Sequence, residues 1–306
     1  SGATLMTGNL TTLRRQIASA GDLKSVVRTM KASAASAIGQ YERSVAALAD
    51  YAGTVEIGLG QCLRSANPMG AHTGDLSSPT GNAAVHAIVF GSDQGLVGRF
   101  NEAVVEHAVA ALTTSQAPTK TKVWAVGERV HVRLLDADIV PEGAFLVPGT
   151  VKLITRLVGE ILEEVQSTPN GPIDEAQSAI LMLFYNRPTA GGYEPVSQRL
   201  LPLDVQWQHR LAQQPWPAEQ HPEVLDTSAQ TLRAFIREHL FVSLFRASAE
   251  SLASENASRL AAMQRADRNI GELLQELHAR FHRLRQAGID EELFDVIAGF
   301  DALSPE

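Results

Sequence analysis

Residues 252–263 have the sequence LASENASRLAAM and lie within a run from Asp226 to Leu303 that contains no proline. Apolar residues recur in this run at intervals of three and four, which places them on one face of an α-helix. A continuous helix of this extent would be roughly 115 Å long. A compact chain of 306 residues would measure only roughly 50 Å across. We therefore expect this helix to extend beyond the globular part of the chain.

A second proline-free stretch, Leu10–Arg64, carries a narrow apolar stripe at helical spacing. The stripe consists of Leu13, Ile17, Leu23, Val26, Val27, Met30, Ala34, Ile38, Tyr41, Val45 and Leu48. A long helix needs a partner for such a stripe, because most helix stability in proteins comes from packing the apolar face. The two terminal stretches are therefore predicted to pair as an antiparallel coiled coil, with the middle of the chain inserted between them.

The middle of the chain, roughly residues 82–205, alternates between strand-like and helix-like segments. Strands are expected at 83–90, 122–126, 139–147, 178–185 and 196–205, and helices at 100–112, 127–135 and 150–165. Such alternation is typical of an α/β domain with a mostly parallel sheet. The predicted fold is thus α/β, an antiparallel coiled coil of long N- and C-terminal helices with an inserted Rossmann-like domain. The expected divisions are 9–66 for the first helix, 67–222 for the α/β domain with its linkers, and 223–306 for the last helix.

Composition narrows the class of protein. The net charge is −8, from 26 basic and 34 acidic residues, which argues against a general nucleic-acid binder. A single cysteine, Cys62, excludes an internal disulfide and any multi-cysteine metal site. No apolar run approaches the roughly 18 residues that a membrane span requires, and Ser1–Leu5 has no signal-peptide character. We expect a soluble, cytoplasmic protein.

Three signatures resemble the gamma subunit of rotary ATP synthases. The first is Ile17, Ser19, Met30-Lys31 and 34–36 (AAS); the second is 92–101 (SDQGLVGRFN), similar to the family's Ser-Asp-x-Gly-Leu-x-Gly-x-x-Asn turn. The third runs from 254–263 (SENASRLAAM) through Ala266, Asn269 and 271–273 (GEL) to 285–289 (RQAGI). The signatures occur in the family's order, in both terminal helices and in the middle domain.

The resemblance implies a central rotor shaft with no catalytic residue, cofactor or metal of its own. Its implied partners are the alpha and beta subunits of a catalytic hexamer, the epsilon subunit and a membrane ring of c subunits, on the cytoplasmic side of a bacterial inner membrane. It would couple ion flow through that ring to conformational cycling of the catalytic sites. The expected subunit-contact residues are Arg28, Met30, Lys31, Arg259, Met263, Arg285, Gln286, Ile289, Val296 and Ile297.

One stretch departs from the family's pattern. The usual Lys-Ile-Thr-Lys-Ala-Met run appears as 25–30, SVVRTM, so that one basic position is lost and Arg28 replaces the other. The first helix still carries six basic residues against two acidic ones between Thr11 and Val45. This departure suggests a divergent branch, and it leaves open a gamma-like subunit of a second, sodium-translocating ATPase.

Other interpretations of particular features remain open at this stage. Gly91–Gly98 follows a strand and precedes a helix, as in a nucleotide-binding α/β enzyme, but its glycines do not have the dinucleotide-binding spacing. We expect a tight turn there, with Asp93 and Asn101 satisfying backbone groups. His278 and His282 share one helix face without an evident third metal ligand. The last helix could instead break near Gly288 and fold its tail back.

Overall fold

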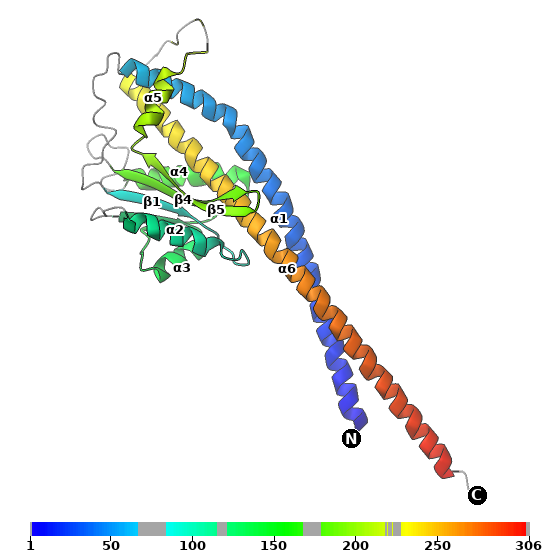
Figure 1. The fold of residues 1–306 in the computed structure, drawn as a ribbon. Helices are drawn as coiled ribbons and strands as arrows, with labels where there is room; N and C mark the ends of the chain where they lie inside the picture. Colours follow the sequence, from blue (N-terminus) through cyan, green and yellow to red (C-terminus); the bar gives the residue numbers. More distant parts are fainter. Residues whose placement is uncertain are drawn as a thin grey trace. The chain divides into compact units, whose positions relative to one another are not determined.

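The computed structural model describes residues 2–66, 84–114, 121–167, 179–217, 219, 222 and 228–303. The chain divides into two compact units. The terminal unit consists of Ser1–Ala34 and Leu260–Glu306, and the sheet unit is Ala35–Arg259. The two long helices, α1 (Gly2–Ala66) and α6 (Ser228–Leu303), contribute residues to both units (Figure 1). The first helix thus begins earlier than its sequence stripe predicted. The predicted linker at 67–81 lies outside the described residues.

A five-stranded sheet forms the centre of the sheet unit. Its strands are β1 (Val85–Phe90), β2 (Thr121–Val126), β3 (Gly143–Phe145), β4 (Ile180–Thr189) and β5 (Gly192–Leu201), in the order β3-β2-β1-β4-β5. The first four are parallel to their neighbours, and β5 is antiparallel to β4. Every residue of β1 is buried, as expected for a parallel strand covered on both faces.

Helices cover the two faces of the sheet (Figure 1). One face packs against α2 (Phe100–Thr114) and α3 (Glu128–Asp136), through side chains such as Val104 and Leu134. The other face packs against α4 (Val151–Ser167) and the sheet-unit parts of α1 and α6. The predicted α/β layering is therefore confirmed, and its larger core lies between the sheet and the long helices.

The end of the α/β domain differs from the prediction. The last strand was expected at 196–205 in a mostly parallel sheet, but β5 ends at Leu201 and forms an antiparallel hairpin with β4. The helix α5 (Val205–Gln213) follows. Asp204 begins it, because its carboxylate accepts a hydrogen bond of 2.9 Å from the backbone N–H of Trp207. An aspartate directly before an apolar helical segment is a typical N-cap signal, and it marks the start of this helix in the sequence.

The helix α5 is held by the end of α1. The guanidinium of Arg64 donates to the backbone carbonyl of Ala212 at 2.9 Å and to that of Gln214, so it satisfies carbonyls that the end of a helix leaves without partners. Gly60 of α1 permits this close approach, since a Cβ atom there would lie 2.5 Å from the carbonyl oxygen of Leu211.

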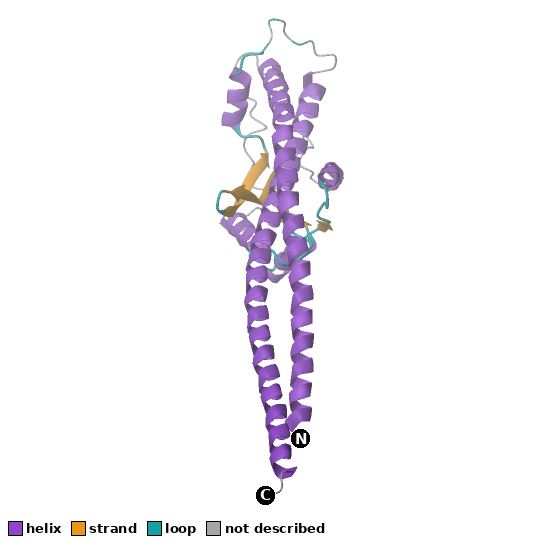
Figure 2. Cartoon of the chain, turned by 90° about the vertical axis from the view of Figure 1, so that its right-hand side faces the viewer, coloured by secondary structure: helices purple, strands orange, loops and turns teal. Residues whose placement is uncertain are grey.

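In the terminal unit, α1 and α6 lie side by side (Figures 1 and 2). Their buried residues recur every seven positions: Leu13, Ala20 and Val27 on α1, and Met263, Ile270 and Leu277 on α6. A seven-residue apolar repeat is the pattern of a coiled coil. Lys31 contacts Asp267 while Arg14 contacts Phe281, so the helices run antiparallel, as predicted. Among the described residues, no helix is long and apolar enough to cross a membrane.

We predict that Gly60→Ala destabilises the protein by about 1–3 kcal/mol, because the added methyl group would be forced against the Leu211 carbonyl. Gly53→Ala in the same helix is the matched control, since a Cβ atom there meets nothing within 4 Å. The control should gain roughly 0.5–1 kcal/mol of helix propensity. Urea denaturation measures both; equal effects of the two substitutions would contradict the close contact.

Candidate functional site: the terminal helix pair and the turn after strand β1

An acidic side chain of α6 holds two basic side chains of α1 within the terminal unit. The Nζ atom of Lys31 lies 3.0 Å from Oδ2 of Asp267, and Nε of Arg28 lies 3.7 Å from its Oδ1. The hydrogen bond from Lys31 is the main reason that the pKa of Asp267 lies below its ordinary value. Part of the basic character of the first helix therefore serves the pairing of the two helices.

Two of the predicted contact residues turn toward the seam between the helices. Met263 is only 3% exposed, and Met30 is half-buried against the same apolar cluster. Their side chains fill the space between α1 and α6. In this chain the two methionines therefore pack α1 against α6.

The other predicted residues of the last helix face outward. Arg285 and Gln286 are exposed, and so is Ile289. Val296 is 69% exposed and Ile297 is 48% exposed. Because α6 continues without interruption to Leu303, the alternative of a break near Gly288 is wrong.

Further exposed apolar side chains lie beside Val296 near the end of α6. Phe294 is 70% exposed, and Leu293 is exposed beside it. We call Leu293, Phe294, Val296 and Ile297 the apolar end of α6. Exposed apolar clusters of this kind mark interaction sites.

The first helix also exposes two residues that the sequence placed in its apolar stripe. Leu23 and Val26 are both more than half exposed, because the seam uses the positions of Leu13, Ala20 and Val27 at intervals of seven. Counting apolar residues at intervals of seven along α1 would have excluded Leu23 and Val26 from the seam. The looser spacing of three and four placed them in the same stripe as the seam residues.

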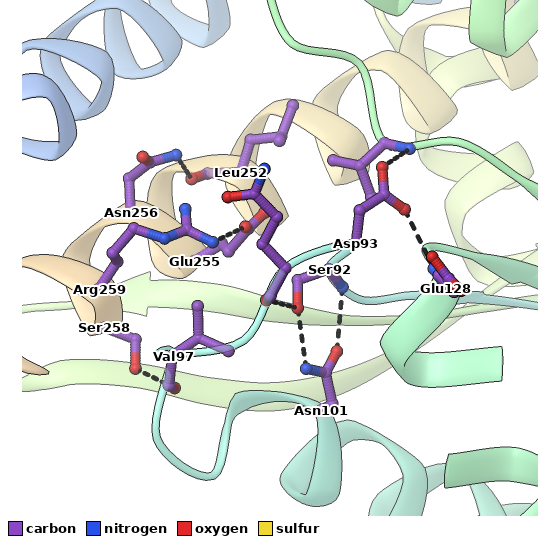
Figure 3. Close-up of polar contacts among 12 residues, drawn as sticks. Ser92, Asp93, Val97, Asn101, Glu128, Leu252, Glu255, Asn256, Ser258 and Arg259 are labelled. Atoms are coloured by element: carbon purple, nitrogen blue, oxygen red, sulfur yellow. Dashed lines mark hydrogen bonds and ion pairs between the residues drawn. The ribbon is translucent and has the colours of Figure 1, made fainter. Parts of the chain in front are cut away.

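In the sheet unit, the turn after β1 is closed by its own polar side chains (Figure 3). Asn101 accepts a hydrogen bond from the backbone N–H of Ser92 at 2.9 Å and donates one to Ser92 Oγ at 2.8 Å. The carboxylate of Asp93 accepts from the backbone N–H groups of Glu128 and Val147, each at 3.0 Å. The expectation that Asp93 and Asn101 satisfy backbone groups is confirmed.

The same turn contacts α6 within the sheet unit (Figure 3). Ser258 Oγ donates a 2.5 Å hydrogen bond to the carbonyl of Val97. The guanidinium of the next residue, Arg259, lies 2.6 Å from the carboxylate of Glu255, one helical turn earlier, and the two side chains are only 13% and 6% exposed. Burial raises the pKa of Glu255, while Arg259 opposes the increase. Arg259, a predicted subunit contact, is therefore engaged inside the chain.

The remaining chemical alternatives gain no support from the geometry. His278 and His282 are exposed, with ring centroids 6.5 Å apart, and the described residues contain no group of three potential metal ligands. Cys62 is buried in α1, and burial raises the pKa of its thiol. Such a thiol behaves as a packing residue rather than a reactive one.

Together, the fold and these contacts define a class of protein in which an antiparallel pair of long terminal helices is joined to an inserted α/β domain. A family model described as ATP synthase matches residues 9–303. The chain therefore belongs to the ATP synthase family, as a gamma subunit, the non-catalytic central stalk of that membrane-associated complex.

Individual relatives agree with this assignment. The chain is 28% identical over 298 residues to the ATP synthase gamma chain of Methylobacterium nodulans, covering 96% of this chain and 99% of the relative. It is 29% identical over 301 residues to that of Rhizorhabdus wittichii, with the same coverage.

Solved structures share the fold. The match to a chain of the Euglena gracilis mitochondrial ATP synthase OSCP/F1/c-ring structure has a TM-score of 0.61 at 16% identity, over 97% of this chain and 95% of that one. A chain of the Tetrahymena thermophila central stalk and c-ring structure matches with a TM-score of 0.54 at 19% identity, over 79% and 99%.

The Asp267 contact predicts a pH dependence of stability. Because the folded pKa of Asp267 lies below its ordinary value, its carboxylate stabilises the folded state above an ordinary pKa of about 3.9, and this stabilisation is lost as the pH falls through the lowered pKa. Asp267→Asn should therefore lower the melting temperature at pH 7, and the difference from the parent chain should shrink below about pH 4.

Asp290→Asn provides the control on the same helix, because Asp290 is exposed and forms no ion pair with a described residue. Thermal melts followed by circular dichroism at pH 7, 5 and 3 measure both variants. A difference for Asp267→Asn that persists unchanged at pH 3 would contradict the ion-pair account.

Proposed function

We propose that this chain turns as the central rotor shaft inside a hexamer of alpha and beta subunits. In this role it couples ion flow through a membrane ring of c subunits to conformational cycling of the catalytic sites in the hexamer. The observation that carries the proposal is the uninterrupted helix α6 ending in exposed apolar side chains, among them Phe294 and Val296. A surface of this kind requires a partner that surrounds it.

The mechanism would be coupling by shape. A ring with three equivalent catalytic sites cannot make the same contacts with one asymmetric shaft. Each site therefore experiences a different interaction energy, which biases it toward an open or a closed state. Rotation also requires that no single contact be too strong. The apolar end of α6 suits this requirement, because packing contacts are individually weak and non-directional.

The predicted contact residues divide into two groups under this proposal. Arg285, Gln286, Ile289, Val296 and Ile297 are outward on α6 and would contact the hexamer directly. The second group, Arg28, Met30, Lys31, Arg259 and Met263, would act mainly by keeping the shaft stiff, because these side chains already engage partners within the chain.

The α/β domain would carry the contacts to the epsilon subunit and the c ring. We retain residues 9–66, 67–222 and 223–306 as the functional divisions of the chain. As a peripheral subunit of the complex, it would lie on the cytoplasmic side of a bacterial inner membrane. The relatives named above support a bacterial setting.

A second candidate is the corresponding subunit of a separate, sodium-translocating ATPase. The altered run at 25–30 supports a separate branch, because Arg28 and Lys31 contact Asp267 within the chain and the contacts of this stretch with a hexamer would differ from the family's usual ones. Identities of only 27–29% to the gamma chains agree with a divergent branch. The two candidates share one shaft mechanism and differ in the ion that the ring moves.

The rotor proposal predicts that the chain co-elutes at one copy per hexamer when mixed with alpha and beta subunits, and that sustained ATPase activity requires it. Replacing Phe294 and Val296 with serine should lower that activity or speed dissociation at least several-fold, because the apolar contact is lost. The matched control replaces Val140 and Leu146 of the sheet unit, which are each 79% exposed, with serine. Equal behaviour of both double variants would argue against a buried end of α6.

A further inference from the structure

A pocket of about 340 Å³ lies within the sheet unit, lined by residues of α1, β5, α5 and α6 and of the segment before α5. Its volume falls at the lower end of the range of roughly 300–1,000 Å³ that is usual for small-molecule sites. None of the ten individually predicted contact residues of the two long helices lines it. Figure 1 shows α5 beside the sheet-unit ends of α1 and α6.

The inner part of this pocket is apolar and aromatic. Leu200 and Val242 are buried there, and the ring of Trp207 packs against His239 with 4.6 Å between ring centroids. Burial, together with the positive charge of Arg246, lowers the pKa of His239 to about 4. The imidazole is therefore uncharged at neutral pH, and this wall of the pocket is a neutral aromatic surface.

Three exposed arginines from three different elements line the same pocket: Arg199 of β5, Arg210 of α5 and Arg246 of α6. Among the described residues, their side chains form no ion pair or hydrogen bond. Other arginines of the sheet unit do have carboxylate partners, such as Arg133 with Glu102. Guanidinium groups match phosphate oxygens in geometry as well as charge.

Two carboxylates also line the pocket, and they do not cancel the arginines. Asp204 is engaged as the N-cap of α5 through the N–H of Trp207. Glu56 is half-buried and has no ion pair with a described residue. With His239 neutral, three positive and two negative side chains leave the lining with a net positive charge.

We propose that this pocket binds a small organic phosphate with a planar body, such as a nucleotide. Arg199, Arg210 and Arg246 would hold the phosphate group. The planar body would pack on Trp207, over the buried side chains of Leu200 and Val242. The site is separate from the glycine-containing turn at 91–98 and does not depend on the rotor proposal.

The test uses the isolated full chain, so that nucleotide sites of other subunits are absent. Isothermal titration calorimetry with ATP, AMP and inorganic phosphate should show saturable binding that is weakest for inorganic phosphate. The double variant Arg210→Gln with Arg246→Gln should weaken nucleotide binding about tenfold or more, because charge-assisted hydrogen bonds are lost. The control pair, Arg99→Gln with Arg156→Gln, removes the same charge from exposed sites elsewhere and should leave the affinity unchanged.

Glu56→Gln gives a result of opposite sign that misfolding cannot imitate. Removing this carboxylate should tighten nucleotide binding several-fold, because it takes a negative charge out of the pocket lining. Trp207→Leu should weaken the binding of AMP while leaving that of inorganic phosphate nearly unchanged, and a thermal melt of the variant reports its fold.

The proposal is overturned by no saturable binding of any soluble phosphate, by equal affinities of the parent chain and the Arg210/Arg246 variant, or by weaker binding by Glu56→Gln. Vesicles with and without phosphatidylglycerol form a separate arm. Binding to anionic vesicles without binding to soluble phosphates would also contradict it. The Arg210/Arg246 variant is also mixed with alpha and beta subunits. Normal assembly of this variant would show that a failure of the pocket proposal leaves the rotor proposal intact.

Discussion

The seam of apolar side chains between the two terminal helices is the constraint on which the rest of this molecule depends. Neither helix could remain ordered alone, because the burial of an apolar face supplies most of the stability of a helix in water. The repeat of seven residues that places Leu13, Ala20 and Val27 against α6 leaves the remaining faces of both helices outward. Only the side chains of α1 and α6 that lie outside the seam are therefore available for contacts with other subunits.

Polar contacts add specificity to this apolar pairing. Asp267 binds Lys31 and Arg28 across the helix pair, while Arg259 and Glu255 form a nearly buried pair on α6 beside the turn after β1. Breaking a buried pair is costly because it leaves an uncompensated charge. Several charged residues of the chain therefore serve to hold its own helices and turn in place.

Much of this architecture could be predicted from the sequence. The long helices followed from proline-free runs with helical spacing, and β1 followed from a continuous apolar run that a buried parallel strand requires. The failures have physical causes. Asp204 is the N-cap that starts α5 directly after the last strand, in a stretch for which the sequence predicted no helix. Met263 and Arg259 resemble the family's contact residues, but sequence spacing cannot show that the first fills the seam and the second pairs with Glu255. The pocket next to Trp207 is lined by residues from separate segments of the chain, so no local sequence motif could predict it.

Disulfide cross-linking of the full chain tests the helix register most directly. The contacts of Lys31 with Asp267 and of Arg14 with Phe281 define the register of the two helices and place Val27 level with Ile270. Cysteines introduced at these two positions in a Cys62→Ser background should form an intramolecular disulfide under mild oxidation, because Val27 and Ile270 are buried in the same cluster and disulfides form only between residues at such close range. Cysteines at Val27 and Leu277, one heptad out of register, should not. Equal cross-linking of both pairs, or of the second pair alone, would contradict the antiparallel seam described above.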